Sequence, residues 1–105
     1  MIQSKNLTLA DNEAAGTGIT QKTGILFVEY TLAATGVHYS AVFTLYDSVG
    51  TPTTVLTAGN GTYFSLTVTT DTKVNVYWLT NQIYVENKLG TEEEIFVTFY
   101  GPTGI

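Results

Sequence analysis

Residues 74–87 constrain the fold of this chain more than any other segment. Two runs in which apolar and polar side chains alternate stand on either side of a two-residue turn, Thr80-Asn81. Such alternation is typical of β-strands, and a two-residue connection between two such runs is typical of an antiparallel hairpin. A single register puts apolar side chains opposite each other on one face, which we expect to be the core face. Its pairs are Trp78 with Ile83 and Val76 with Val85.

The same register fixes the opposite, outer face of this hairpin. It places Tyr77 opposite Tyr84 and Asn75 opposite Glu86. A slip of one residue would move the apolar side chains to the outer face and break both sets of pairs. The sequence therefore predicts one hairpin with a defined register.

The rest of the chain shows similar alternation in short runs separated by turn residues. The chain contains 20 threonines among its 105 residues, and Thr, Val, Tyr, Phe and Ile suit a pleated, half-buried surface. Asp47-Ser48-Val49-Gly50 predicts a four-residue turn, Asn60-Gly61 predicts a hairpin turn, and Pro52 indicates an edge position. The further expected strands lie at residues 2–9, 24–32, 39–46, 64–69 and 94–100.

This pattern predicts an all-β fold, an antiparallel β-sandwich or jelly roll of about 7–9 short strands. A chain of 105 residues has room for one compact domain. We expect residues 1–22 to form an N-terminal strand followed by a loop or arm that could reach a neighbouring subunit. Residues 23–105 are expected to form the β-sandwich domain itself.

Composition excludes several classes of function. The net charge is −5, with four lysines and no arginine, whereas nucleic acids and anionic membranes are bound mainly by Lys and Arg. The absence of cysteine excludes disulfides, thiolate zinc sites and thiol catalysis. The beginning of the sequence lacks the apolar region of a signal peptide, so we expect synthesis in a cytoplasm.

Residues that could carry catalysis or bind a metal are few. His38 opens a strand and has no recognisable nucleophile or orienting acid, so we interpret it as a strand-end histidine. Glu29 and Glu86 could flank a glycosidase cleft, but positions on solvated or interfacial strand faces account for them better. The cluster Glu92-Glu93-Glu94 could hold Ca²⁺, although its spacing favours a solvated turn. We therefore expect no enzymatic activity, no cofactor and no metal.

Four aromatic residues are the strongest candidates for a binding surface. Tyr77, Tyr84, Phe96 and Tyr100 are expected on one outer face of a small sheet. That face could be covered by a second sheet, form a subunit interface, or serve as a platform on which sugar rings stack. In the last two cases Asn75, Gln82 and Glu86 could supply polar contacts.

The C-terminal third also resembles small β-sandwich proteins of tailed-bacteriophage virions. The likeness lies in Lys73-Val74-Asn75-Val76-Tyr77, in the hairpin from Gln82 to Gly90, and in the closing strand Ile95 to Gly101. Such proteins often carry a "K-x-N-V-Y" strand, an "I-Y-x-x-N-x-x-G" hairpin and a "V-T-F" strand. The resemblance covers about residues 23–101.

The resemblance implies a structural role in the virion. It implies a capsid cement or decoration protein that bridges capsomers. Its partners would be two further copies of the same chain, in a homotrimer, and a major capsid protein. The alternative that it implies is a carbohydrate- or receptor-binding module at the tip of a tail fibre or head fibre, with a host glycan as ligand. It offers no catalytic residues.

Overall fold

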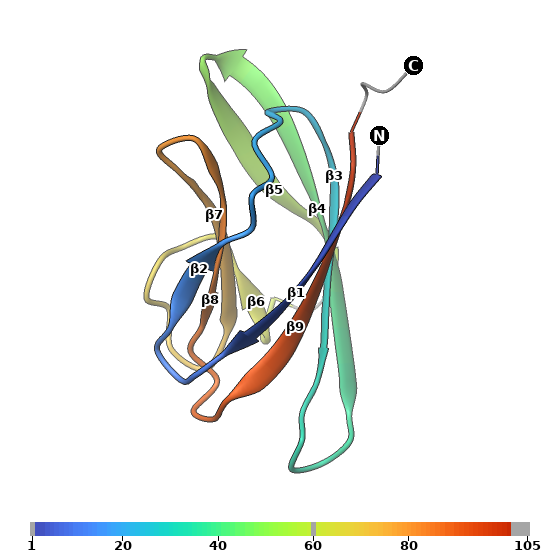
Figure 1. The fold of residues 1–105 in the computed structure, drawn as a ribbon, viewed down its shortest axis with the longest axis vertical. Coiled ribbons are helices and arrows are strands. Elements are labelled where there is room, and N and C mark those ends of the chain that lie inside the picture. The colour runs from blue at the N-terminus through green and yellow to red at the C-terminus, as the bar shows by residue number, and fades with distance from the viewer. Residues whose placement is uncertain (1, 60, 102–105) are drawn as a thin grey trace.

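The protein folds into two β-sheets that pack face to face (Figure 1). The structure, a computed structural model, describes residues 2–59 and 61–101, with only the backbone for residues 47–49. Nine strands lie within these ranges, and none of the described residues is helical, which confirms the predicted all-β sandwich. The strands are β1 (Ile2–Leu9), β2 (Ala14–Gly16), β3 (Gly24–Thr31), β4 (His38–Val49), β5 (Thr51–Gly59), β6 (Phe64–Ser65), β7 (Val74–Leu79), β8 (Gln82–Asn87) and β9 (Glu93–Tyr100).

The two sheets differ in size. The large sheet has five strands in the order β1-β9-β3-β4-β5, and all of its neighbours are antiparallel. The small sheet has the order β2-β8-β7-β6, in which only the two-residue pairing of β6 with β7 is parallel. Strands β8 and β9 follow each other in the chain but belong to different sheets. In Figure 1 the large sheet stands on the right and the small sheet on the left.

The core lies between the sheets and follows the alternation in the sequence. Every second side chain of β3, from Leu26 to Tyr30, is buried, and β4 repeats the pattern from Ala41 to Leu45. Burial of apolar surface, at roughly 25 cal/mol per Å², is the main force that holds the two sheets together. The small sheet contributes Phe64, Val74, Val76, Ile83 and Val85 to the same core.

The hairpin β7–β8 has the register that its sequence predicts. Its pairs include Trp78 with Ile83, Val76 with Val85, Tyr77 with Tyr84 and Asn75 with Glu86. Val76, Ile83 and Val85 are buried, and Trp78 packs against the core while half-buried. The turn places Thr80 at a φ of 59°, in the left-handed region that tight two-residue hairpins require.

Two predicted connections are wrong. Strand β4 continues through Val49, which pairs with Thr51, so the chain turns at Gly50 alone instead of over four residues. Gly50 has a φ of 81°, which glycine adopts without strain. The predicted hairpin turn includes Asn60, which lies outside the described residues. No hairpin forms there, because β5 and β6 lie in different sheets.

The expected strand over residues 64–69 is mostly wrong as well. Only Phe64 and Ser65 pair with β7, after which the chain leaves the sheet. Leu66 and Val68, the apolar residues that alternate with polar ones in this segment, are exposed. The alternation in this segment therefore does not mark a strand. Pro52, by contrast, lies in β5, which is an edge strand of the large sheet as predicted.

The N-terminal residues are part of the sandwich and not an arm beside it. Strand β1 pairs along its whole length with β9, from Ile2 opposite Tyr100 to Leu9 opposite Glu93. Strand β2 then crosses to the small sheet and pairs with β8. Between β2 and β3, Ile19 is buried in the core. Residue 22 therefore does not mark a boundary in the fold.

Candidate functional site

The outer face of the small sheet carries a pair of stacked tyrosines. The rings of Tyr77 and Tyr84 have centroids 5.9 Å apart and planes inclined by 11°. Both side chains are half-buried. Burial raises the pKa of Tyr77 above its ordinary value, and the nearby Glu86 carboxylate and Tyr84 hydroxyl add to this increase. The pair thus offers two parallel aromatic rings next to a carboxylate.

Asn75 and Glu86, predicted to contact a partner or ligand beside these tyrosines, are buried instead. Asn75 is 0% exposed and Glu86 is 7% exposed. The Asn75 amide donates to the Glu86 carboxylate at 2.9 Å and to the Thr70 carbonyl at 3.0 Å. The Thr69 backbone amide donates to the same carboxylate at 2.7 Å. The segment 66–73 therefore covers this part of the face.

Phe96 and Tyr100 lie in the other sheet. Both belong to β9, whose alternate residues Ile95, Val97 and Phe99 are buried, so Phe96 and Tyr100 are on the outer face of the large sheet. The prediction that the four aromatic residues line one face is therefore wrong. They form two pairs on opposite sides of the sandwich, because β8 and β9 belong to different sheets.

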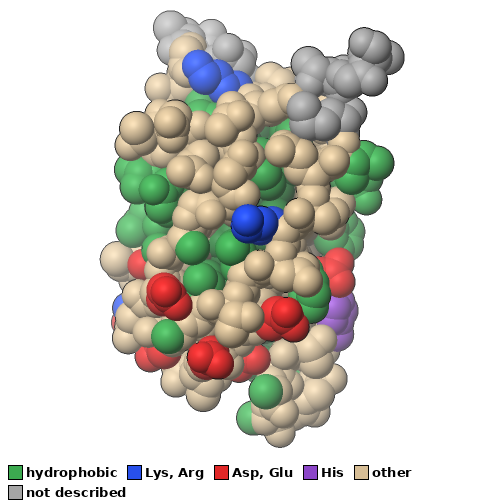
Figure 2. All heavy atoms as spheres, in the orientation of Figure 1, with side chains coloured by type: hydrophobic (Ala, Val, Ile, Leu, Met, Phe, Trp, Pro, Cys, Tyr) green, Lys and Arg blue, Asp and Glu red, His purple; other side chains and the backbone are tan. Residues whose placement is uncertain are grey.

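No described segment covers the outer face of the large sheet, and this face is mostly apolar at one end. Figure 2 shows hydrophobic side chains along the right flank, which is the side of the large sheet in Figure 1. The large exposed apolar side chains that lie on this face are Ile2, Ile25, Tyr46, Val55, Phe96 and Tyr100.

His38 lies at the polar end of this face, at the beginning of β4, as predicted. Its Nδ1 is 2.9 Å from the Thr31 hydroxyl, and its Nε2 is 3.6 Å from the Glu29 carboxylate. Glu29 faces outward from the large sheet, whereas Glu86 faces outward from the small sheet. The two glutamates considered for a glycosidase cleft therefore do not face each other.

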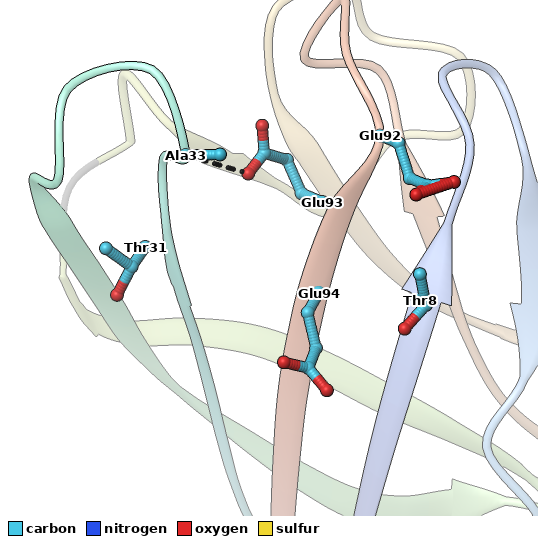
Figure 3. Close-up of a pocket in the computed structure, with 6 residues that line it drawn as sticks. All are labelled: Thr8, Thr31, Ala33, Glu92, Glu93 and Glu94. Carbon is cyan, nitrogen blue, oxygen red and sulfur yellow. Dashed lines mark hydrogen bonds between the residues drawn. The ribbon is translucent and has the colours of Figure 1, made fainter.

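The three consecutive glutamates line a depression of about 410 Å³ at the end of the sandwich (Figure 3). Glu93 is 4% exposed, which corrects the expectation of a solvated turn for this residue. It accepts hydrogen bonds from the Ala33 backbone amide and the Thr91 hydroxyl. Its side chain turns toward Ala33 and away from Glu92 in Figure 3. Within the described residues, no three His, Asp or Glu side chains form a group that could hold a metal ion.

Asn87 is a residue whose role the sequence did not indicate. It is 0% exposed, and its side-chain amide donates to the carbonyls of Leu9 and Thr91 at 2.9 and 2.8 Å. Its Oδ1 accepts from the Leu89 amide at 2.9 Å. Asn87 thereby joins the small sheet to β1 and orders the turn that leads to β9. This accounts for the Asn in the "N-x-x-G" part of the hairpin pattern.

Comparison with known proteins yields a likeness of fold. No protein-family model matches the chain, and no curated protein matches it significantly. Nor does the described part of the chain contain a helix long and apolar enough to cross a membrane. Among solved structures, the tailspike protein of Acinetobacter phage vB_ApiP_P1 is similar with a TM-score of 0.60 and 10% sequence identity. The match covers 94% of this chain but 21% of the tailspike, so the chain has the fold of one part of a much longer protein.

Proposed function

We propose that the chain is a non-enzymatic component of a tailed-phage virion that acts by binding other proteins. The observation that carries this proposal is the outer face of the large sheet, where six large apolar side chains among the described residues are between 36% and 67% exposed. Contiguous exposed apolar surface is typical of protein interaction sites. The separation of Glu29 from Glu86 also removes the acid pair considered for catalysis.

A position in the tail is favoured over one on the capsid. A solved structure that shares this fold over 94% of the chain is a tailspike protein. The sequence resemblance to capsid cement proteins supports the other position, in which a homotrimer would bridge copies of a major capsid protein. Both positions require the same property, a face that binds protein neighbours.

Immunogold electron microscopy of the phage whose genome encodes the chain tests this proposal. Purified particles are first digested and analysed by mass spectrometry to detect the chain. Gold label at the tail is the expected result. Label distributed over the head would support the cement role instead, and absence of the chain from washed particles would refute a virion role altogether.

A receptor-binding role is a second candidate, favoured by the stacked Tyr77 and Tyr84 rings. Parallel aromatic rings offer a platform for the apolar faces of sugars, and the hydroxyl of each tyrosine can form hydrogen bonds beside it. Because Asn75 and Glu86 are buried, polar contacts would have to come from other side chains, of which Gln82 is half-buried on the same face.

A glycan array probed with the wild-type chain and with Tyr84→Ala tests this second candidate. Binding that the substitution reduces at least about tenfold would support it. The matched control is Tyr100→Ala, which removes a tyrosine from the opposite sheet. Absence of binding to any glycan, or equal loss with both variants, would refute the assignment to the Tyr77–Tyr84 pair.

A further inference from the structure

The register of the large sheet arranges its outward side chains in rows across the strands. One row runs from the exposed Ile2 through Tyr100, Ile25 and Thr44 to Val55. The next row consists of Ser4, Thr98, Phe27, Val42 and Ala58. We call these ten residues the apolar rows.

Charge is distributed unevenly over this face. The apolar rows contain no charged residue, although the chain as a whole has a net charge of −5. The charged groups of the face lie in the rows beyond them, where Glu29 is opposite Phe96 and Ser40, and Glu94 is opposite Thr8. Figure 2 shows the same gradient, with hydrophobic side chains above and acidic and histidine side chains below on the right flank.

The size of the apolar rows matches a small, weak protein interface. Five strands about 4.8 Å apart and about four residues along each strand at about 3.4 Å give the two rows an extent of about 24 by 14 Å. The flat area is thus about 330 Å² before side-chain relief is added, less than half of the roughly 800 Å² that each partner contributes to a standard interface, so we expect a weak association that depends on concentration.

We infer that the apolar rows are a self-association surface, on which the same face of a second copy of the chain packs. Two acidic copies repel each other least where both are uncharged, and the apolar rows are such a place. Thr44, Thr98 and the Tyr100 hydroxyl can supply hydrogen bonds within the contact. A twofold axis packs the same face of two copies directly on each other, whereas a threefold axis gathers three such faces, each of which contacts its two neighbours through different parts. The inference rests on the proposed function in treating this face as a protein-binding surface, and it names the partner.

Sedimentation velocity and native mass spectrometry of the purified chain test this inference. The wild-type chain is expected to form a species of two or three times 11.4 kDa within a range of about 1–300 µM. Ile25→Glu places a carboxylate in the middle of the apolar rows of every copy. It is expected to increase the dissociation constant at least about tenfold.

Leu79→Glu is the matched control. Leu79 and Ile25 are each 48% exposed, and Leu79 lies on the outer face of the small sheet, so both variants add one negative charge at a site of equal exposure. The control should change the dissociation constant less than about twofold. Tyr100→Ala, a truncation of a 48% exposed ring, provides a second variant in case Ile25→Glu does not fold.

A monomeric wild-type chain throughout this range would overturn the inference, as would equal weakening by Ile25→Glu and Leu79→Glu. A monomer that binds another virion protein through the apolar rows would also overturn it, because the partner would then be a different chain. Failure of the self-association inference can be told apart from failure of the proposed virion role. Absence from virions leaves the solution mass unaffected, and a monomer in solution leaves the immunogold label unaffected.

Discussion

The two outer faces of the sandwich show what becomes of a polar side chain in the middle of a strand. Each face carries a mid-strand glutamate and a pair of aromatic residues. On the small sheet Glu86 is 7% exposed and accepts hydrogen bonds from Thr69 and Asn75. On the large sheet Glu29 is only half-buried, and its described contact is a 3.6 Å approach to His38.

The difference arises from the segment 66–73, which covers one face and has no counterpart on the other among the described residues. This segment is held by Thr69 and Thr70, which hydrogen-bond to the outward side chains of β7 and β8. Thr69 and Thr72 both have a positive φ, at 64° and 65°, a conformation that costs a threonine of order 1–3 kcal/mol. The hydrogen bonds to Glu86 and Asn75 offset this cost, so the covered face contributes to stability.

The largest expected difference between the faces is in the effect of removing each glutamate. Glu86→Ala removes the side-chain acceptor of the Thr69 amide and one of the two acceptors of the Asn75 amide, and should lower the free energy of unfolding by about 3 kcal/mol. Glu29→Ala removes a partly exposed contact with His38 at 3.6 Å and should cost less than about 1 kcal/mol. Urea denaturation of both variants measures this difference, and equal costs would show that the segment 66–73 contributes little to stability.

Local signals made the hairpin β7–β8 predictable. Its alternation, its two-residue turn and its pairs all favour one register, and Trp78 and Ile83 are opposite each other as expected. The same alternation at Leu66 and Val68 was misleading, because threonine-rich segments with apolar residues at every second position also occur outside sheets. Whether such a segment joins a sheet depends on a free strand edge, which is a property of the whole fold.

The candidate site was less predictable than the fold because it depends on the assignment of strands to sheets. The turn from Asn87 to Thr91 carries the chain from the small sheet to the large one, whereas the prediction placed Tyr84 and Phe96 in one sheet. Local sequence does not distinguish a turn between paired strands from a turn between sheets. The burial of Asn75 and Glu86 was hidden for a similar reason, since their cover comes from a segment that was predicted to be a strand.

The aromatic pairs should differ by a smaller amount. Tyr77→Ala removes a half-buried ring and its stacking on Tyr84, and should lower the free energy of unfolding by about 2 kcal/mol. Tyr100→Ala should lower it by less than about 0.5 kcal/mol when measured on the monomer at low concentration. Thermal or urea denaturation of both variants checks this order. The reverse order would mean that Tyr100 is packed within the monomer and that the open face is less open than its 48% exposure indicates.

The smallest effect is expected from Tyr77→Phe, and it should appear only at high pH. Burial raises the pKa of Tyr77 above its ordinary value of 10.0, with Glu86 and Tyr84 adding to the increase. The unfolded chain therefore loses the Tyr77 hydroxyl proton at a lower pH than the folded chain does. The contribution of this protonated hydroxyl to the free energy of unfolding is complete below about pH 10 and is lost as the pH rises through the pKa of Tyr77 in the folded state. Tyr77→Phe should match the wild type within about 0.5 kcal/mol at pH 7 and lose less stability above pH 10.

Burial raises the pKa of Tyr30 as well, but Tyr30 is present in both proteins, so the difference between their urea midpoints reports Tyr77. If both midpoints fell equally between pH 9 and pH 11, the Tyr77 hydroxyl would be as solvated as an exposed one, and the covered face would end before it reaches the tyrosine pair.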